Sequence, residues 1–474
     1  MKVLLTGSTG YIGRRLEEKL LEDDNISLRL FVRNINTTTK ETREKVEIVQ
    51  GDTFDKEALK KALDRVDIAY YLIHSLNKDN YKDLDKISAQ NFLDVAASCG
   101  VKKIIYLGGL GIKNKDTSEH LLSRIETGEI LSSNNTIQTI WIRAGVIIGS
   151  GSASFEIIRN LTQKIPIMTT PKWVNTKAQP IAVNDVLLYL KESLYVELDK
   201  SIVVDIGAEQ LSYKDMMEQT AFVLGLKRYI IPVPFLSIGL SSYWLNLFTP
   251  VPFKVAKALI EGLKSEVIKQ NDNARIVFPG IKPIAYKKAV SKAIEQIKQN
   301  QVLSRWNDNS GKVWDTIHIK EFSTAVFVDR QEADIKTLNK EKVYNSFLSI
   351  GGENGWFAFD ILWKIRGFLD KVLGGVGLRR GRRDKKTLRI GDCLDFWKVV
   401  DIKENERLLL YAQMILPGEA WLEFMIKDDK LIQSAYFYPK GVLGRIYWYS
   451  LMPLHYFVFR NMIVSIVNKS MKNI

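Results

Sequence analysis

A glycine-rich motif near the start of the chain contains the residue types that a phosphate-binding turn needs. The motif, at residues 6–13, follows a short apolar run and opens a segment with apolar residues at helical spacing. Its first glycine permits a tight turn, its second lets a pyrophosphate approach the backbone, and its third lets the helix pack close to the strand. The N-terminus of that helix favours an anion. The motif therefore predicts a dinucleotide site formed by Gly7, Ser8, Thr9, Gly10, Tyr11, Ile12 and Gly13.

Two polar residues follow the next two predicted strands. An NAD enzyme usually has a carboxylate at the end of the second strand, where it binds the ribose 2′-hydroxyl. This chain has Arg33 there without an adjoining acid, and arginine can form a forked pair with a 2′-phosphate. We therefore expect NADP as the cofactor, with NAD as the alternative if Arg33 is only a solvated residue. Asp52, after the third strand, either accepts a hydrogen bond from the adenine amino group or caps a turn.

A parallel sheet would position these residues, and residues 1–150 have the pattern that builds one. Short apolar runs alternate with amphipathic segments, which is typical of a doubly wound α/β fold with helices on both faces of the sheet. We expect strands at 2–6, 27–33, 46–50, 67–73, 103–107 and 137–143. Helices are expected at 11–22, 56–63, 84–97 and 119–131.

The motifs of this region resemble those of a known family. Besides the glycine motif, the resemblance rests on Gly51-Asp52, on Tyr71-Leu72-Ile73-His74-Ser75, and on the segments at 106–111, 143–149 and 179–186. Over about residues 1–300 the chain is similar to the atypical, extended and NmrA-like short-chain dehydrogenase/reductases. The resemblance implies a Rossmann fold that binds a nicotinamide dinucleotide. It also implies that the glycine motif, Arg33, Asp52, Ile73 and His74 contact the cofactor.

The chain departs from this family at the catalytic positions. Active members use a serine or threonine after the fifth strand and a Tyr-x-x-x-Lys pair on the next helix, whereas this chain has Gly108-Gly109 and His120-x-x-x-Arg124. Histidine can transfer protons near neutral pH, and an adjacent arginine lowers its pKa. We expect His120 to be the proton donor, with Arg124 beside it. The alternative is that both are surface or cofactor-anchoring residues.

Residues 151–305 are expected to complete the reductase as a small substrate region. Small hydroxyl residues at 149–154 precede a predicted helix at 155–161, where they either cap the helix or bind a substrate anion. Further helices are predicted at 186–194, 213–224, 254–270 and 286–299. An uncharged run at 229–253 is long enough to span a bilayer, but its four prolines favour a buried or interfacial segment.

A linker at 305–312 precedes a predicted third region, residues 313–474. We expect strands at 318–328, 387–389, 394–401, 407–416, 420–427 and 431–438, with a hairpin turn at Asp428-Asp429. Helices are expected at 342–350, 356–372 and 444–470, the last kinked at Pro453. This order resembles the START and polyketide-cyclase-like helix-grip fold, an α+β fold. The whole chain resembles bacterial atypical reductases that carry a C-terminal domain of unknown function.

Charge and cysteine content restrict the partners and the compartment. The net charge of the 474 residues is +14, and residues 364–389 alone hold ten Lys/Arg against two Asp/Glu. Such a local patch is either a solvated loop or a site for anionic lipid headgroups or a phosphate-bearing ligand. No motif supports nucleic-acid binding. Two cysteines cannot form a disulfide framework, and the four histidines lie too far apart in the sequence to suggest a metal site. We expect a cytoplasmic protein, peripheral to the inner membrane surface if it contacts lipid.

These observations together predict an NADP(H)-dependent oxidoreductase that acts on an apolar or lipid-like small molecule. Two alternatives come from other classes of protein. One is a non-catalytic sensor that binds a dinucleotide, and the other is a lipid or isoprenoid carrier. The substituted catalytic positions favour the sensor, whereas a large composite cleft would favour the enzyme.

Overall fold

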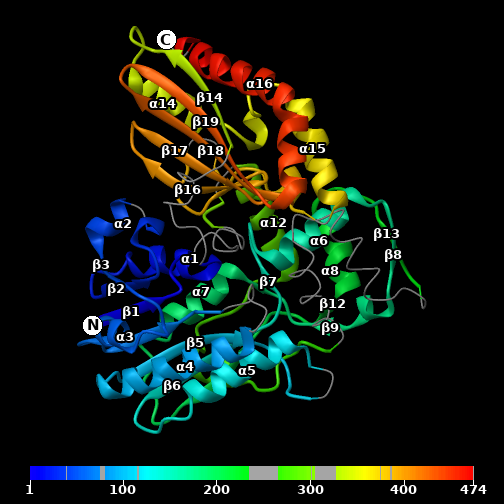
Figure 1. The fold of residues 1–474 in the computed structure, drawn as a ribbon. Coiled ribbons are helices and arrows are strands. Elements are labelled where there is room, and N and C mark those ends of the chain that lie inside the picture. Colours follow the sequence, from blue (N-terminus) through cyan, green and yellow to red (C-terminus); the bar gives the residue numbers. More distant parts are fainter. Residues whose placement is uncertain are drawn as a thin grey trace. The chain divides into compact units, whose positions relative to one another are not determined.

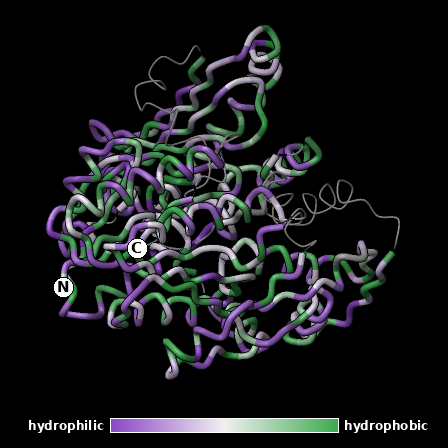
Figure 2. Tube along the Cα trace, turned by 90° about the horizontal axis from the view of Figure 1, so that it is seen from below, coloured by the Kyte–Doolittle hydropathy of each residue, from purple (hydrophilic) through white to green (hydrophobic). Residues whose placement is uncertain are grey.

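The computed structural model describes residues 1–38, 40–74, 81–114, 117–233, 265–299, 302–304, 327–373, 375–384 and 387–472. The chain divides into two compact units, Met1–Asn309 and Ser310–Ile474 (Figure 1). The linker predicted at 305–312 lies outside the described residues. Hydrophobic and hydrophilic stretches alternate along the trace (Figure 2), as they do in chains that bury one side of each helix or strand.

The first unit is built on a seven-stranded parallel sheet with the order β11-β6-β5-β4-β1-β2-β3. This is the doubly wound Rossmann-type arrangement that the sequence predicts. The order reverses between β1 and β4, and in such sheets ligands bind outside the carboxyl ends of the strands at that point. The strands are β1 (Lys2–Thr6), β2 (Ser27–Val32), β3 (Glu47–Gln50), β4 (Ile68–Tyr71), β5 (Lys103–Gly109), β6 (Gln138–Ala144) and β11 (Ile202–Ile206).

Helices cover both faces of this sheet. On one face α1 (Tyr11–Leu20), α7 (Val183–Glu192) and α11 (Asn273–Val277) contribute to an apolar core with alternate residues of the strands. On the other face α3 (Lys56–Leu63), α4 (Tyr81–Ser98) and α5 (Glu119–Leu131) form a second core. A short helix, α2 (Lys40–Lys45), is absent from the sequence-based expectations because Lys-Glu-Thr-Arg-Glu-Lys has no apolar stripe.

The rest of the first unit forms a smaller region with its own apolar core. Three helices contribute to that core: α6 (Ala153–Lys164), α8 (Tyr213–Val223) and α12 (Tyr286–Lys298). Its strands are β7 (Ile147–Ile148), β8 (Ile167–Thr170), β9 (Lys177–Ala178), β10 (Ile181–Ala182), β12 (Leu211–Ser212) and β13 (Tyr229–Pro232). Ser152 caps α6 by accepting a hydrogen bond from the Phe155 amide.

One helix prediction in this region is wrong as far as the structure describes it. The expected helix at 254–270 is described only from residue 265 onward, and residues 265–270 are not helical. Instead, Val267 forms a bridge to Ala178, and its amide donates to the Lys177 carbonyl at 3.0 Å. The run at 229–253 is described only as far as residue 233, where β13 pairs with β8.

The second unit contains a six-stranded antiparallel sheet with the order β14-β19-β18-β17-β16-β15. The strands are β14 (Phe327–Asp334), β15 (Cys393–Leu394), β16 (Trp397–Lys403), β17 (Arg407–Ala412), β18 (Gly418–Lys427) and β19 (Lys430–Pro439). The helices are α14 (Lys340–Leu348), α15 (Asp360–Val372) and α16 (Gly441–Lys472). Side chains of α14 and α16 pack on one face of the sheet in a single apolar core. The ribbon of α16 bends near its middle (Figure 1), and Pro453 lies inside the helix.

Three local expectations for this unit can be compared with the structure. The hairpin at Asp428-Asp429 is confirmed, since both residues have positive φ angles of 49° and 61°. The helix expected from residue 356 begins only at Asp360, because Phe357 and Phe359 have φ angles of 61° and 49°. The strand expected at 387–389 is wrong: the Thr387 and Arg389 amides donate to aspartate side chains instead of to a neighbouring strand.

Candidate functional site

The glycine motif forms a tight turn between β1 and α1. Gly7 has a φ angle of +68°, and a Cβ atom there would lie 2.5 Å from the Leu72 carbonyl oxygen. A Cβ atom on Gly13 would lie 2.1 Å from the Gly7 carbonyl oxygen. Near Gly10 only the Gly7 carbonyl comes within 4 Å, at 3.2 Å, so protein packing constrains this position less. Packing thus requires the first and third glycines.

The turn leaves hydrogen-bond donors available to an anion. Gly10 is the N-cap residue of α1, makes no side-chain capping bond, and the first turn of α1 contains no acid. The Ser8 hydroxyl is buried and has no hydrogen-bond partner among the described residues. Orphaned donors of this kind suit a phosphate group. The residues present therefore fit the pyrophosphate of a dinucleotide.

The side chains of Tyr11 and Ile12 point into protein. The Tyr11 hydroxyl donates to the Ser150 carbonyl at 3.3 Å, and the Arg15 guanidinium lies 4.8 Å from the centre of its ring. Burial raises the pKa of Tyr11 to about 12. Ile12 packs against the core of the first unit. Tyr11 and Ile12 can therefore contact a cofactor only through their backbone groups.

Arg33 and Asp52 lie at the carboxyl ends of β2 and β3. Arg33 directly follows β2 and is exposed. The Asp52 carboxylate accepts hydrogen bonds from the Phe54 amide at 3.2 Å and from the Thr53 hydroxyl at 3.4 Å. Asp52 therefore caps this turn, which is one of the two roles expected for it from the sequence.

The structure brings together three residues that are distant in the sequence. His74 follows β4 and its Nδ1 lies 2.7 Å from the Asp85 carboxylate on α4. Its Nε2 lies 3.0 Å from Nδ1 of His120 on α5. The Ser123 hydroxyl donates to the same Asp85 oxygen at 3.0 Å. We call Asp85, His74 and His120 the relay, because hydrogen bonds connect them in that order.

Sequence reasoning identified two members of the relay and missed the third. It assigned His74 to the cofactor and His120 to the chemistry, without a contact between them. Asp85 was missed although a signal exists: it lies on the buried face of α4 with Ser88, Ala89 and Phe92. An acid at helical spacing with buried residues needs a polar partner inside the protein.

The hydrogen bonds determine which nitrogens carry protons when Asp85 is ionised. His74 then donates from Nδ1 to the carboxylate, and its Nε2 accepts from Nδ1–H of His120. This leaves Nε2 of His120 as a proton acceptor at the end of the relay. Burial, the neighbouring His74 and Arg124 hold the pKa of His120 well below its ordinary value of 6.5. Burial also lowers the pKa of His74, although Asp85 opposes that shift.

Arg124 is held against β5. Its guanidinium donates to the Leu107 carbonyl, and its own carbonyl accepts from the Tyr106 hydroxyl at 2.9 Å. The two glycines at the expected serine position are explained by packing. A Cβ atom on Gly108 would lie 2.4 Å from the Trp141 indole nitrogen, and one on Gly109 would lie 2.7 Å from Leu121.

The turn and the relay lie at adjoining strand ends. The Thr6 hydroxyl donates to the Tyr70 carbonyl at 2.8 Å, and the Leu72 amide donates to the same hydroxyl at 3.2 Å. Since β1 and β4 are neighbours in the sheet, the glycine turn and residues 72–74 meet at the point where the strand order reverses. Among the described residues no group of three or more His, Cys, Asp or Glu side chains could hold a metal ion.

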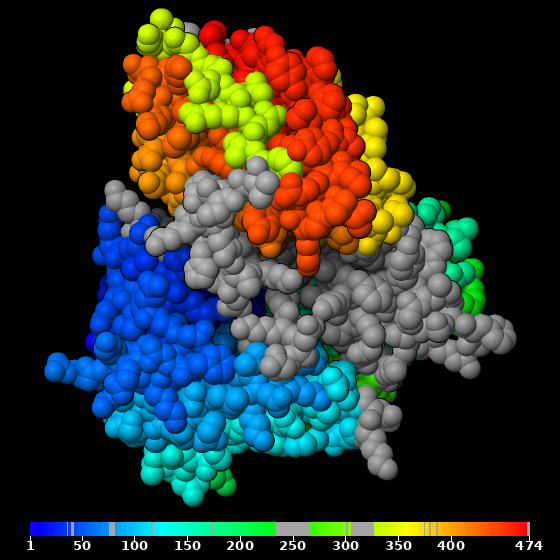
Figure 3. All heavy atoms as spheres, viewed as in Figure 1, coloured from blue at the N-terminus to red at the C-terminus, as the bar shows by residue number. Residues whose placement is uncertain are grey.

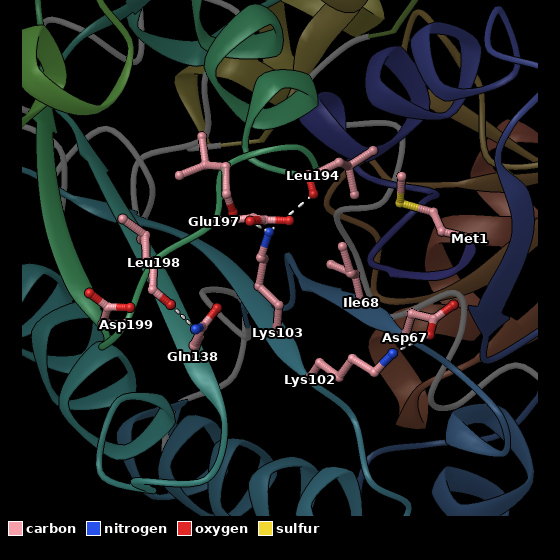
Figure 4. Close-up of a pocket in the computed structure, with 11 residues that line it drawn as sticks. Met1, Asp67, Ile68, Lys102, Lys103, Gln138, Leu194, Glu197, Leu198 and Asp199 are labelled. Carbon is pink, nitrogen blue, oxygen red and sulfur yellow. Dashed lines mark hydrogen bonds and ion pairs between the residues drawn. The ribbon is translucent and has the colours of Figure 1, made fainter.

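A cavity of about 670 Å³ lies at the opposite edge of the sheet, where the strands begin (Figure 4). Its central side chain, Lys103, donates to the carbonyls of Ser193, Leu194 and Val196 just beyond the end of α7. Burial lowers the pKa of Lys103. Lysine at a helix C-terminus satisfies free carbonyls, so this residue has a structural role.

The basic segment of the second unit is partly buried. Arg383 forms an ion pair with Asp392 at 3.1 Å, and both side chains are almost fully buried. Arg382 donates to the carbonyls of Leu348 and Ile350. The side chains of Arg379 and Arg380 lie outside the described residues. Arg382 and Arg383 therefore stabilise the fold and are not available to a ligand.

Two family models match separate parts of the chain. Residues 7–139 match a family described as NAD(P)H-binding, and residues 322–462 match a protein family of unknown function, DUF2867. The chain is 37% identical over 128 residues to the auxiliary protein GraX of Staphylococcus aureus and 26% identical over 170 residues to an uncharacterized membrane protein of Methanocaldococcus jannaschii. These matches cover 25% and 33% of this chain, and the chain spans only 40% and 47% of the two relatives.

Solved structures resemble the first unit in fold. A nucleoside-diphosphate-sugar epimerase from Staphylococcus aureus has a TM-score of 0.51 at 16% identity, covering 61% of this chain and all of the epimerase chain. Triphenylmethane reductase from Citrobacter sp. has a TM-score of 0.51 at 19% identity, covering 62% of this chain and all of the reductase chain. The first unit therefore has a Rossmann-type fold and includes the segment that matches an NAD(P)H-binding family, and the second unit includes the segment that matches DUF2867.

Proposed function

We propose that the chain is an NADP(H)-dependent oxidoreductase that acts on an apolar or lipid-like small molecule. The observation that carries this proposal is the relay of Asp85, His74 and His120 beside the glycine turn. A carboxylate and two histidines in series supply a group that can accept and return a proton at the end of the relay. The NAD(P)H-binding family match supports the cofactor class.

The residues around the turn would hold the dinucleotide. The α1 N-terminus and the Ser8 hydroxyl would receive the pyrophosphate, and Arg33 would receive a 2′-phosphate. The related fold of triphenylmethane reductase, solved in complex with NADP(H), supports this cofactor. When bound, the nicotinamide supplies or accepts a hydride.

Proton transfer is the task of the relay. When a carbonyl is reduced, its oxygen gains a proton, and we assign Nε2–H of protonated His120 as the donor. In the oxidative direction the neutral Nε2 accepts the alcohol proton, and the hydrogen bonds to His74 and Asp85 stabilise the charge that develops. Burial, with a smaller contribution from Arg124, lowers the pKa of both histidines, so the proton-accepting form of His120 predominates at neutral pH.

The second unit supports a START-like helix-grip assignment by its topology. An antiparallel sheet with β14 beside β19 packs against a long C-terminal helix. We assign it to binding or positioning the apolar substrate. A cytoplasmic setting is supported by Cys99 and Cys393, neither of which forms a disulfide.

The test is cofactor consumption by the full-length protein with a panel of carbonyl and enone compounds. We expect turnover with NADPH that falls by about two to four orders of magnitude in His120→Gln. NADPH binding should be unchanged in that variant. The matched control is His455→Gln, a partly buried histidine on α16 of the second unit, which should keep full activity. Tight cofactor binding without turnover of any compound would contradict the enzyme proposal and favour the alternative, a non-catalytic sensor that binds a dinucleotide.

A further inference from the structure

Helix α15 of the second unit packs Leu362 and Trp363 against the core, but it also buries two charged residues and exposes several apolar side chains. Asp370 and Lys371 are buried, whereas Ile361, Phe368 and Leu369 are exposed by 67%, 65% and 50%. Asp370 is fixed inside because its carboxylate accepts hydrogen bonds from the Gly377 and Ile415 amides at 2.8 and 2.7 Å. Because the buried Asp370 fixes the orientation of the helix, these apolar side chains face outward in the folded unit.

Apolar side chains are also exposed at the beginning of α16. Residues 413–417 form hydrogen bonds toward both helices: Arg366 of α15 donates to the Ile415 carbonyl at 3.0 Å, and the Lys440 amide, just before α16, donates to the Pro417 carbonyl at 2.8 Å. Figures 1 and 3, which share one view, draw α15 next to the first part of α16. At the start of α16, Val442 and Leu443 are exposed by 72% and 73%. We define the apolar face as Ile361, Ile365, Phe368, Leu369, Val442 and Leu443.

The exposed charges on α15 and the beginning of α16 are mostly basic, with Asp360 as the exposed acid. Lys364 and Arg445 are exposed on the same two helices. α16 contains no Asp or Glu, and in α15 the acids are Asp360 at the first position and the buried Asp370. Exposed apolar side chains with basic side chains on the same helices are the pattern of helices that lie in the headgroup region of a bilayer.

We propose that the apolar face binds the surface of an anionic lipid bilayer. The apolar side chains enter the boundary between headgroups and acyl chains, while Lys364 and Arg445 contact the negative headgroups. Basic residues near an anionic leaflet and apolar residues inside it give two independent sources of affinity. The surface would hold the reductase at the place where a lipid-like substrate is found.

The contact is peripheral and does not span the bilayer. By length and composition Gly441–Met471 is the one described helix that could cross a membrane. Its second half, however, belongs to the core of the unit, because Val458, Met462 and Ile466 are buried against the sheet. Insertion of the whole helix would expose that core to water or lipid.

Vesicle flotation with the full-length protein tests the proposal. We expect binding to vesicles of phosphatidylglycerol mixed with phosphatidylcholine, and weaker binding to phosphatidylcholine alone. Phe368→Ser combined with Leu443→Ser should weaken binding by about tenfold or more, since two inserted side chains are lost. Lys364→Glu combined with Arg445→Glu should weaken binding to the anionic vesicles by about tenfold or more, and added salt should have the same effect.

The matched control is Ile276→Ser, since Ile276 in the first unit is 77% exposed. All of these side chains lie at the surface, so the variants should keep the circular dichroism spectrum of the unmodified protein. Absence of binding to either vesicle, or equal binding by all variants, would overturn the proposal. The proposal would also be overturned if the protein did not bind vesicles and the apolar double variant changed from a dimer to a monomer. A second copy of the chain would then be the partner that covers the apolar face.

Discussion

Asp85 raises the proton affinity of His74, the middle residue of the relay. Its hydrogen bond and charge raise the pKa of His74, against the effect of burial. Carbonyl reduction needs protonated His120, so the rate is full below the folded pKa of His120 and is lost as the pH rises through it. Removing the charge in Asp85→Asn should move that loss to lower pH. The rate near pH 7 should then fall by about tenfold for each pH unit by which the midpoint moves.

A pH–rate profile of kcat measures this change. Ser123→Ala is the matched control, because it removes the Ser123 hydrogen bond to Asp85 but keeps the carboxylate. The control profile should stay close to that of the unmodified protein. An Asp85→Asn profile with the same midpoint and a uniformly lower rate would mean that Asp85 only orients His74.

Arg33 should determine the choice between the two nicotinamide cofactors. One charge-assisted contact is worth on the order of 1.5–3 kcal/mol, which corresponds to roughly ten- to a hundredfold in affinity. NADPH should therefore bind more tightly than NADH, and Arg33→Asp should erase or reverse that preference. Titration calorimetry with both nucleotides measures it, with Arg65→Asp as the control because the Arg65 side chain is 87% exposed elsewhere on the unit. Equal affinities in the unmodified protein would show that Arg33 does not contact a 2′-phosphate.

Sequence alone could identify the glycine turn but not the relay. The turn is local: eight consecutive residues contain every group that builds it. The contact between His74 and His120 joins residues 46 positions apart, and it exists because β4 and β5 are neighbours whose following segments meet at one edge. If the order of the strands is unknown, the sequence shows that His74 and His120 can transfer protons but not that they lie close together.

At the scale of elements, Gly13 determines how closely α1 approaches β1. A Cβ atom there would lie 2.1 Å from the Gly7 carbonyl and 2.7 Å from Ser8 Cα, both backbone atoms that cannot move alone. Gly13→Ala should displace the start of α1, lower the free energy of unfolding by about 1–3 kcal/mol and weaken dinucleotide binding. Urea unfolding and nucleotide titration measure the two effects.

Gly280→Ala provides the comparison for this prediction. No atom lies within 4 Å of a Cβ built on Gly280, and its φ angle is not in the left-handed region. This substitution should change the free energy of unfolding by less than about 1 kcal/mol. An equal loss of unfolding free energy in both variants would contradict the prediction that the close approach of α1 to β1 requires glycine at position 13.

Periodicity predicted most elements, and its errors have local causes. Residues 356–359 read as part of a helix, but left-handed φ angles at Phe357 and Phe359 delay its start. Residues 387–389 have the pattern of a strand, but the amides of this segment donate to the side chains of Asp384 and Asp392. In both places a short-range conformational or hydrogen-bonding preference competes with a pattern of only a few residues.

At the scale of the whole molecule, the sequence predicts two architectures but not which surfaces remain uncovered. The alternation of strands and helices in the first unit and the meander of strands in the second each follow from local spacing. The outward apolar side of α15 does not, because it depends on Asp370 finding partners in the separate segments at 377 and 415. An amphipathic helix shows that it has two sides, whereas tertiary contacts decide which one is buried.

Stability should fall in mildly acidic solution because histidines in both units have lowered pKa values. Burial is the largest cause for His74, His120 and His455. The unfolded chain therefore binds more protons than the folded chain below the ordinary histidine pKa of about 6.5. The stabilisation is complete above that value and is lost as the pH falls through the lower folded pKa values. Carboxylates titrate mainly below this range, so histidines dominate the interval from about pH 7.5 to about pH 5.5.

Urea unfolding at the two ends of that interval measures the effect in each unit. The free energy of unfolding should be lower at the acidic end, and His120→Gln should reduce this pH dependence in the first unit. His455→Gln should do the same in the second unit, where the Nδ1 atom of His455 is buried with no hydrogen-bond partner among the described residues. Each variant serves as the control for the other, because their substitutions lie in different units. A pH dependence that neither substitution changes would assign the acid sensitivity to carboxylates and contradict the expected role of the histidines.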